Sequence, residues 1–590
     1  MKKIVLAFAL ISIFNFQPSI SQAQEDGAYN ESVLVKGSYR PTIEQAEKMN
    51  FPAVITDTLT RIDHTFQYSI TPMRLRSVYE PSRIKAARIL GEPTTKLYNN
   101  YFRVGMGNYW SPLADFYWSS TRDTKKTYGI RFNHHSSWGT LPDYGKNHFG
   151  ITGITLFGKY IVADKLQLSS DVKYEHDHNL YYGFTDNTLQ TVLGKTRDDI
   201  SVNDYIASYN VASLNFGLRN MELDVNKLGY AVNLHLSDLW ASWYRNEFNL
   251  NLSGDIHYGF NIGDKYKGVA YLHAEWDGYV QSFDVDGDMP LGFSPITPFN
   301  NTGKHHLNIV KVNPYADFML NGLQFHAGFT AGWDAFTEAS DGTIFRFFPD
   351  VVVSKNLLED ALVLSVGATG GINANNLNTI RQINPYMASD IDYRATRHYD
   401  FVGHARWTIS KKLEANAELS YSLLQDDLSF MLDPNYSLNN VFLASYINDN
   451  RLAIGGDIAF VNDEMLTLRL GGHYYHYDNV DNALVASSGV EVTEVYRPNW
   501  DLLASADVNY EDKWLFHLEG QLLGKTFADN GDEMPMRYGI NAEVEYRHNR
   551  ALSFFLKMDN LAFQRYYYWA NYPSQKGLFI LGLTYTIPHK

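Results

Sequence analysis

The feature that most constrains this chain is a strict alternation of apolar and polar residues, repeated over long segments such as 248–258 and 536–547. Successive side chains of a β-strand point to opposite faces, so each segment presents one apolar and one polar face. Strands of a soluble sandwich are about 5 or 6 residues long, whereas a tilted strand needs about 9 to 11 residues to cross a bilayer. The long alternating segments therefore favour a transmembrane β-barrel over a soluble sandwich.

Two classes of connection join these segments, namely short polar turns and long loops rich in Asn, Asp, Gly and Pro. Short turns are predicted at Ala163-Asp164, Gly263-Asp264, Asn321, Ser410-Lys411-Lys412, Asn462-Asp463-Glu464, Glu511-Asp512-Lys513 and His548-Asn549-Arg550, with further ones near 122–125, 222–226 and 355–359. Long loops are predicted at 179–203, 285–303, 374–396, 425–438, 479–493, 527–535 and 563–575. Outer-membrane barrels place short turns in the periplasm and long loops outside, so about ten short turns predict an antiparallel barrel of about 22 strands. This count requires 439–461 to be a single strand.

Composition is consistent with a membrane wall and excludes several other classes. The 590 residues include 41 Tyr, which we interpret mainly as aromatic girdles and loop residues, because amphipathic rings favour the headgroup level. Without Cys, the chain has no disulfide framework and no Cys nucleophile. A net charge of -15 argues against nucleic-acid binding. No apolar run reaches the roughly 18 residues that a transmembrane helix needs.

The N-terminus has the three parts of a secretory signal. Lys2 and Lys3 precede an apolar run from Ile4 to Phe14, and Ser21-Gln22-Ala23 follows as a small-residue cleavage site. We therefore expect residues 1–23 to be a signal peptide.

Residues 24–96 have irregular apolar spacing and are expected to form a periplasmic or lumenal segment before the barrel, which spans 97–590. Between Arg74 and Lys96 there are six basic residues but only two acidic ones. A positive segment tethered to an acidic barrel is attracted to its lumen, which suggests a mini-plug. A tail that binds a partner explains the same charges, and the sequence leaves both interpretations open.

The end of the chain resembles a known family. Asp559-Asn560-Leu561 opens a Tyr-rich loop, and Tyr572-Pro573-Ser574-Gln575-Lys576-Gly577 leads into a closing strand from Leu578 to Ile587. This resembles the final hairpin of TonB-dependent receptors, and Asn384-Pro385-Tyr386 in a long loop is similar to receptor-type barrels of Bacteroidota. The resemblance implies a receptor-like barrel in the outer membrane of a Gram-negative bacterium.

Members of that family carry a plug domain much longer than residues 24–96, so we expect a barrel without a standard plug. The function that follows is a scaffold or accessory subunit of an outer-membrane transport, secretion or protein-assembly complex. The alternative is a nutrient channel or TonB-dependent-type receptor gated by its loops or by the N-terminal segment. Expected partners are outer-membrane lipid and either a surface lipoprotein or other subunits of an envelope complex, with no nucleic acid.

Candidate chemistry in the sequence is sparse. Glu175-His176-Asp177-His178 is the best metal-like cluster, but its two His share the face expected to point toward lipid and a third ligand at fixed spacing is missing. Asp284-Val285-Asp286-Gly287-Asp288 resembles a calcium loop, but Pro295 stands where an EF-hand needs Glu. The polar residues expected to line the lumen include Arg406, Glu414, Glu418, Glu519, Glu543, Glu545 and Arg547. We predict that the protein is not an enzyme, with no catalytic, cofactor-binding or metal-binding residues and no cofactor.

Overall fold

The computed structural model describes residues 99–587, apart from 121–122, 223–225, 244, 263–265, 285–290, 294–301, 337–343, 389–390, 392, 463–464 and 480–494. The predicted signal peptide at 1–23 and the predicted segment at 24–96 lie outside the described residues. The same holds for residues 285–288 of the calcium-like loop.

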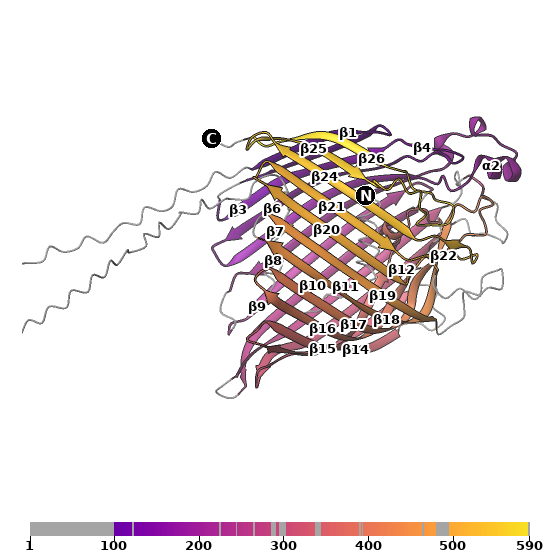
Figure 1. Ribbon diagram of the computed structural model, residues 1–590. Helices are drawn as coiled ribbons and strands as arrows, with labels where there is room; N and C mark the ends of the chain where they lie inside the picture. Colours follow the sequence, from indigo (N-terminus) through magenta and orange to yellow (C-terminus); the bar gives the residue numbers. More distant parts are fainter. Residues whose placement is uncertain are drawn as a thin grey trace, which may run out of the picture. The chain divides into compact units, whose positions relative to one another are not determined.

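A single antiparallel sheet of 22 strands dominates the described chain. The first strand, β1 (Asn100–Gly107), pairs with the last, β26 (Leu578–Tyr585), which closes the sheet into a barrel (Figure 1). The strands between them are β2 (Ser111–Ser119), β3 (Lys126–Ser137), β6 (Phe149–Val162), β7 (Leu166–Leu180), β8 (Ile206–Asn220), β9 (Gly229–Ala241), β10 (Arg245–Ile262), β11 (Tyr266–Asp284), β12 (Thr302–Leu320), β13 (Leu323–Phe336), β14 (Ile344–Leu357), β15 (Leu362–Asn375), β16 (Arg394–Ser410), β17 (Leu413–Leu432), β18 (Phe442–Asn462), β19 (Leu466–Asn479), β20 (Trp500–Tyr510), β21 (Trp514–Leu523), β24 (Arg537–Arg547) and β25 (Leu552–Asp559). The predicted fold class and strand count are confirmed, and β18 is the single long strand that the count required.

Among the described connections, the short turns lie at one end of the barrel and the long loops at the other, where the labels α2, β4 and β22 appear in Figure 1. The predicted short turns fall between consecutive strands, although residues 263–264 and 463–464 and most of the predicted loops 285–303 and 479–493 lie outside the described residues. Asn321 and Gly322 join β12 to β13 with φ of 53° and 76°, the two positive values that a type I′ hairpin turn needs. The alternation of short and long is incomplete, because 108–110 and 242–244 are short connections at the long-loop end.

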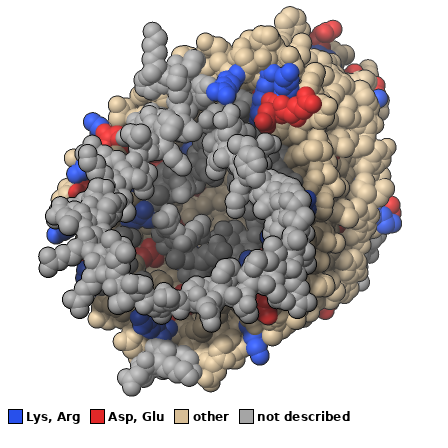
Figure 2. Space-filling view, turned by 60° about the vertical axis from the view of Figure 1, so that its left-hand side comes forward, with Lys and Arg blue, Asp and Glu red and all other residues tan. Residues whose placement is uncertain are grey.

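The outer wall of the barrel is apolar. In β10, Phe248, Leu252 and Ile256 are 46%, 44% and 46% exposed, as expected for side chains that face lipid. Figure 2 shows a side wall with few Lys, Arg, Asp and Glu side chains, most of them near its edges. None of the helices in the described chain has the length and apolarity to cross a membrane.

Small elements occupy the long loops. They are the helices α2 (Asp186–Leu193) and α3 (Leu377–Ile383), the 3-10 helices η1 (Arg197–Asp199) and η2 (Val202–Asp204), and the hairpins β4 (Thr140–Leu141) with β5 (Gly145–Lys146) and β22 (Thr526–Phe527) with β23 (Glu533–Met534). The main buried apolar cluster is also at this end. We call the packed parts of connections 181–205, 376–393, 433–441 and 560–577 the loop cap.

Several of the Tyr residues are buried in the loop cap rather than placed in girdles. Tyr181, Tyr205, Tyr386, Tyr436 and Tyr572 are each at most 5% exposed. The large Tyr count therefore has two structural causes, and the loop residues of the sequence interpretation are in part the buried Tyr of the loop cap.

Candidate functional site

The connection between β15 and β16, residues 376–393, is the best-anchored part of the loop cap, and we call it the α3 loop. Asn376 begins α3, since its side chain accepts a hydrogen bond from the Thr379 amide at 2.8 Å. Glu247 of β10 receives the next free amides, from Leu377 at 2.6 Å and Asn378 at 3.3 Å. A carboxylate at a helix N-terminus satisfies amides that have no partner within the helix. Glu247 is buried and also accepts from the Tyr393 hydroxyl, so it joins both ends of the loop.

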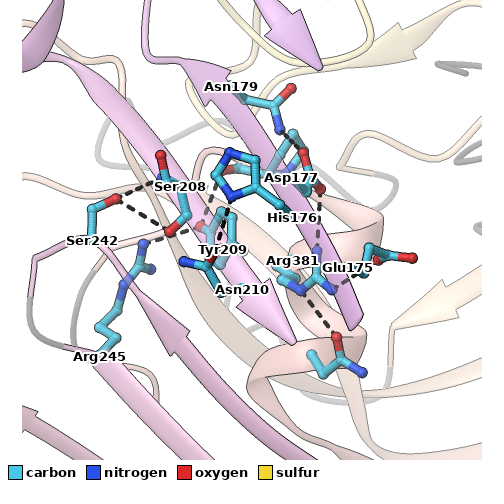
Figure 3. A network of polar contacts seen from close by, with 12 residues as sticks. Glu175, His176, Asp177, Asn179, Ser208, Tyr209, Asn210, Ser242, Arg245 and Arg381 are labelled. Carbon is cyan, nitrogen blue, oxygen red and sulfur yellow. Dashed lines mark hydrogen bonds and ion pairs between the residues drawn. The ribbon is translucent and has the colours of Figure 1, made fainter. Parts of the chain in front are cut away.

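Arg245, two residues before Glu247, holds the middle of the α3 loop. Its guanidinium is fully buried and donates to the carbonyl oxygens of Met387 at 3.2 Å and Ala388 at 2.8 Å. It also donates to the Tyr209 hydroxyl of β8 at 3.0 Å (Figure 3). Because main-chain carbonyls in a loop have no ladder partner, a buried guanidinium that serves two of them fixes the local backbone.

Arg381 of α3 connects the α3 loop to β7. It donates to Asp177 at 3.1 Å and lies 3.4 Å from Glu175 (Figure 3). The cluster Glu175-His176-Asp177-His178 is thereby divided between the two faces of β7. Its carboxylates face inward and hold Arg381, whereas His176 bonds to Asn210 at 2.9 Å on the opposite face. Among the described residues, no group of three or more acidic, His or Cys side chains has the arrangement of a metal site.

Aromatic stacking joins the α3 loop to the last loop of the chain. The rings of Tyr386 and Tyr572 are stacked with centroids 3.5 Å apart, and Tyr182 meets the Tyr572 ring edge-on at 5.1 Å. Burial raises the pKa of both Tyr386 and Tyr572, so these phenols stay neutral. The two motifs that carry the family resemblance, Asn384-Pro385-Tyr386 and Tyr572-Pro573, therefore meet in the loop cap.

A cavity of about 710 Å³ lies between the inner barrel wall and the loop cap. Its lining combines inward-facing side chains of β7, β11, β12, β16, β17, β18, β19 and β24 with residues of the α3 loop and of the last loop. The charged side chains in the lining are Lys173, Lys311, Arg381, Arg451, Arg497 and Arg537, opposed by Glu175, Asp177, Asp277, Asp400 and Asp427. The cavity thus carries a slight excess of cations inside a chain whose net charge is -15.

Arg497 ties the connection after β19 to the barrel. It donates to Asp427 of β17 at 2.7 Å and to Asp449 of β18 at 3.1 Å. These two carboxylates raise the pKa of Arg497, which therefore stays charged although it is nearly buried. This side chain and the α3 loop border the same cavity from different elements.

The polar residues predicted to line the lumen lie on the inner face of their strands. Glu543 accepts from Arg103 of β1 at 2.8 Å, and Glu519 accepts from Asn541 at 3.0 Å. Sequence reasoning proposed no site residues and missed the cavity. The one available signal for the cavity was the presence of isolated arginines in Asn- and Pro-rich loops, such as Arg381 and Arg497. A loop arginine that packs against the barrel needs an acidic partner on the barrel wall.

No protein-family model and no curated protein matches this sequence. Solved structures do match. The ferric-catecholate import receptor Fiu of E. coli K12 is similar with a TM-score of 0.58 and 10% identity over 84% of this chain and 82% of that chain. The ferric enterobactin receptor PfeA of Pseudomonas aeruginosa gives 0.57 and 12% over the same shares. The FrpB iron transporter of Neisseria meningitidis gives 0.60 and 9%, again over 84% and 82%.

At these identities the likeness shows the fold, which is a TonB-dependent receptor-like barrel. The large barrel and these neighbours place the protein in the outer membrane of a Gram-negative bacterium. These neighbours are described as receptors and a transporter. Nothing in them supports the scaffold or accessory role that the sequence put first. The Bacteroidota origin, the short plug region and the partners stay predictions.

Proposed function

We propose that this protein is an outer-membrane receptor that captures a small solute at its extracellular end and passes it toward the periplasm. The observation that carries the proposal is the cavity of about 710 Å³ between the barrel wall and the loop cap, bordered by charged and aromatic side chains. Binding sites are typically concave, of this order of size, and combine apolar walls with a few placed polar groups. The receptor-like fold of the barrel supports the same proposal.

The α3 loop is the proposed gate. It crosses from β15 to β16 and is anchored to β7, β8 and β10, with the Tyr209 hydroxyl of β8 donating to the Pro385 carbonyl oxygen at 3.3 Å, so it lies between the outside and the lumen next to the cavity. The anchors are side-chain contacts, apolar packing and two backbone hydrogen bonds with Phe442 rather than a continuous sheet, and such a segment opens locally without unfolding the barrel. Residues 24–96, expected to be a periplasmic or lumenal segment, are the proposed second barrier. A surface lipoprotein or another envelope subunit stays the proposed partner.

Conductance in planar lipid bilayers tests this function. We expect the full chain to show almost no conductance and a chain lacking 24–96 to conduct. A third chain, which lacks 24–96 and also has 377–392 replaced by a short Gly-Ser linker, is expected to conduct more than the second. A matched control shortens 480–494, which supplies none of the anchors described above. If none of these chains conducts and other envelope proteins co-purify in stoichiometric amounts, transport would be overturned in favour of the scaffold role.

A further inference from the structure

Most charged side chains that line the cavity neutralise one another. Arg381 pairs with Asp177 and Glu175, and Arg497 pairs with Asp427. Lys173 lies 2.9 Å from Glu175, and Lys311 lies 2.6 Å from Glu275. The cavity is therefore built mainly from internal ion pairs, which is the usual way to hold charge in a partly buried place.

Two arginines in the same lining depart from this rule. Arg451 of β18 is 9% exposed and Arg537 of β24 is 6% exposed. Within the described part of the chain, neither has a carboxylate within 4.0 Å, and the Nε of each is buried without a hydrogen-bond partner. The carboxylates next to Arg451 on the wall, Asp427 and Asp449, are held by Arg497.

An aromatic ring lies against one of these guanidinium groups without cancelling its charge. The Arg537 guanidinium carbon lies 4.7 Å from the centre of the Tyr568 ring, a cation–π contact. Arg451 stands directly opposite Tyr477 of β19 in the strand register. An aromatic face orients a guanidinium while its N–H groups stay available to a second partner, so the contact at Arg537 favours binding of an additional group.

An unpaired, nearly buried cation is costly, and a chain with an excess of acidic residues has ample means to pair it. We propose that Arg451 and Arg537 are two subsites for the carboxylate or phosphate groups of an anionic solute. This inference rests on the proposed function, because it names the chemical class that the same cavity receives. Four strand steps separate the two residues, roughly 19 Å along the wall, so each arginine forms a separate subsite for one anionic group.

Titration calorimetry of the detergent-solubilised full chain with pyrophosphate, and with citrate as a carboxylate probe, tests the assignment. A hydrogen bond to a charged group contributes at least about 1.5 kcal/mol, so R451Q and R537Q are each expected to weaken anion binding at their own subsite by about tenfold or more, and the double variant to weaken both. R451K keeps the charge but loses the planar fork, and its binding is expected between those of wild type and R451Q. The matched control is R469Q, since Arg469 of β19 does not line the cavity. Heat-dependent mobility in SDS gels checks that each variant is folded.

The anion assignment fails if wild type binds neither probe, if R451Q and R537Q bind like wild type, or if R469Q loses as much affinity. Maltose and spermidine serve as neutral and cationic probes in the same experiment. Binding of either one without arginine-dependent anion binding overturns the anion class while leaving a solute receptor in place. Failure of every probe together with silent bilayers overturns the proposed function itself.

Discussion

Removing the Glu247 carboxylate is the sharpest way to test whether the α3 loop is held by its polar anchors. In an E247A variant, the amides of Leu377 and Asn378 lose their acceptor, and the Tyr393 hydroxyl loses its partner. The Leu377 amide keeps only its 3.1 Å contact to the Tyr393 hydroxyl. The remaining anchors, Arg245 and Arg381, are unchanged, so the loop is expected to open more often rather than to unfold permanently.

The size of the effect follows from the number and kind of contacts. Glu247 accepts three hydrogen bonds, and a hydrogen bond to a charged group contributes about 1.5 to 3 kcal/mol, so losing all three costs at least about 4 kcal/mol before any recovery. Some of this cost is recovered because the freed amides reach water when the loop opens. We therefore expect the free energy of local opening to fall by about 3 kcal/mol, which is roughly a 100-fold change in the opening equilibrium.

Amide hydrogen exchange measures that equilibrium directly, because exchange from a protected amide requires local opening. Peptides covering 376–388 are expected to exchange roughly 100-fold faster in E247A than in wild type, with β16 and β17 unchanged. E519A is the matched control, since Glu519 is also lumen-facing but accepts from Asn541 and does not contact the α3 loop. If the exchange rate of peptides covering 376–388 in E247A stays within about threefold of the wild-type rate, which corresponds to less than about 1 kcal/mol, the anchoring argument is refuted.

Two further variants test the loop cap and the lipid-facing wall. Y572A removes the ring stacked on Tyr386 at 3.5 Å, and the loss of a large buried side chain costs about 3 to 5 kcal/mol. Limited proteolysis should therefore cut 560–577 faster in Y572A than in Y538A, a control variant on the lipid face. Equal cleavage of the two variants would contradict the packing of the loop cap. L470R places a charge on the lipid-facing side of β19, where Leu470 is 50% exposed, and is expected to lower the free energy of unfolding in urea by about 2 to 4 kcal/mol. The control S505R places its charge in the lumen opposite Glu519 and should be close to wild type in stability. The reverse order of stabilities would contradict the assigned faces.

The loop cap and the cavity beneath it give the barrel a polar interior with a defined ligand-sized space. Tyr182, Tyr386 and Tyr572 form one packed group from three connections, while Arg381 and Arg497 clamp two loops to the wall. Aromatic packing fixes the loops relative to one another, and the ion pairs fix them relative to the barrel. A solute that enters the cavity therefore meets a surface whose charges are largely set before binding, which lowers the cost of ordering on binding.

The barrel itself follows from local sequence pattern. Alternation in 248–258 predicts which residues of β10 face lipid, and Phe248, Leu252 and Ile256 are exposed as that pattern requires. Short turns such as Asn321-Gly322 are also readable, because their backbone conformation is set by two residues. The strand count depends only on such local signals, because an antiparallel barrel joins each strand to its sequence neighbours.

The candidate site could not be predicted in this way. Leu377 meets Glu247 across 130 positions, and Arg381 meets Asp177 across 204 positions. Loops have no periodicity, so nothing near Glu175-His176-Asp177-His178 indicates that its acids will hold an arginine of a distant helix. The sequence by itself determined a closed wall between lipid and water. The reason is that side chains alternate between the two faces of a strand with a period of two, so each residue's face is set by its position along the strand. The tertiary structure alone decided which loops pack in the cap and which arginines stay unpaired, because those outcomes depend on long-range contacts across the barrel.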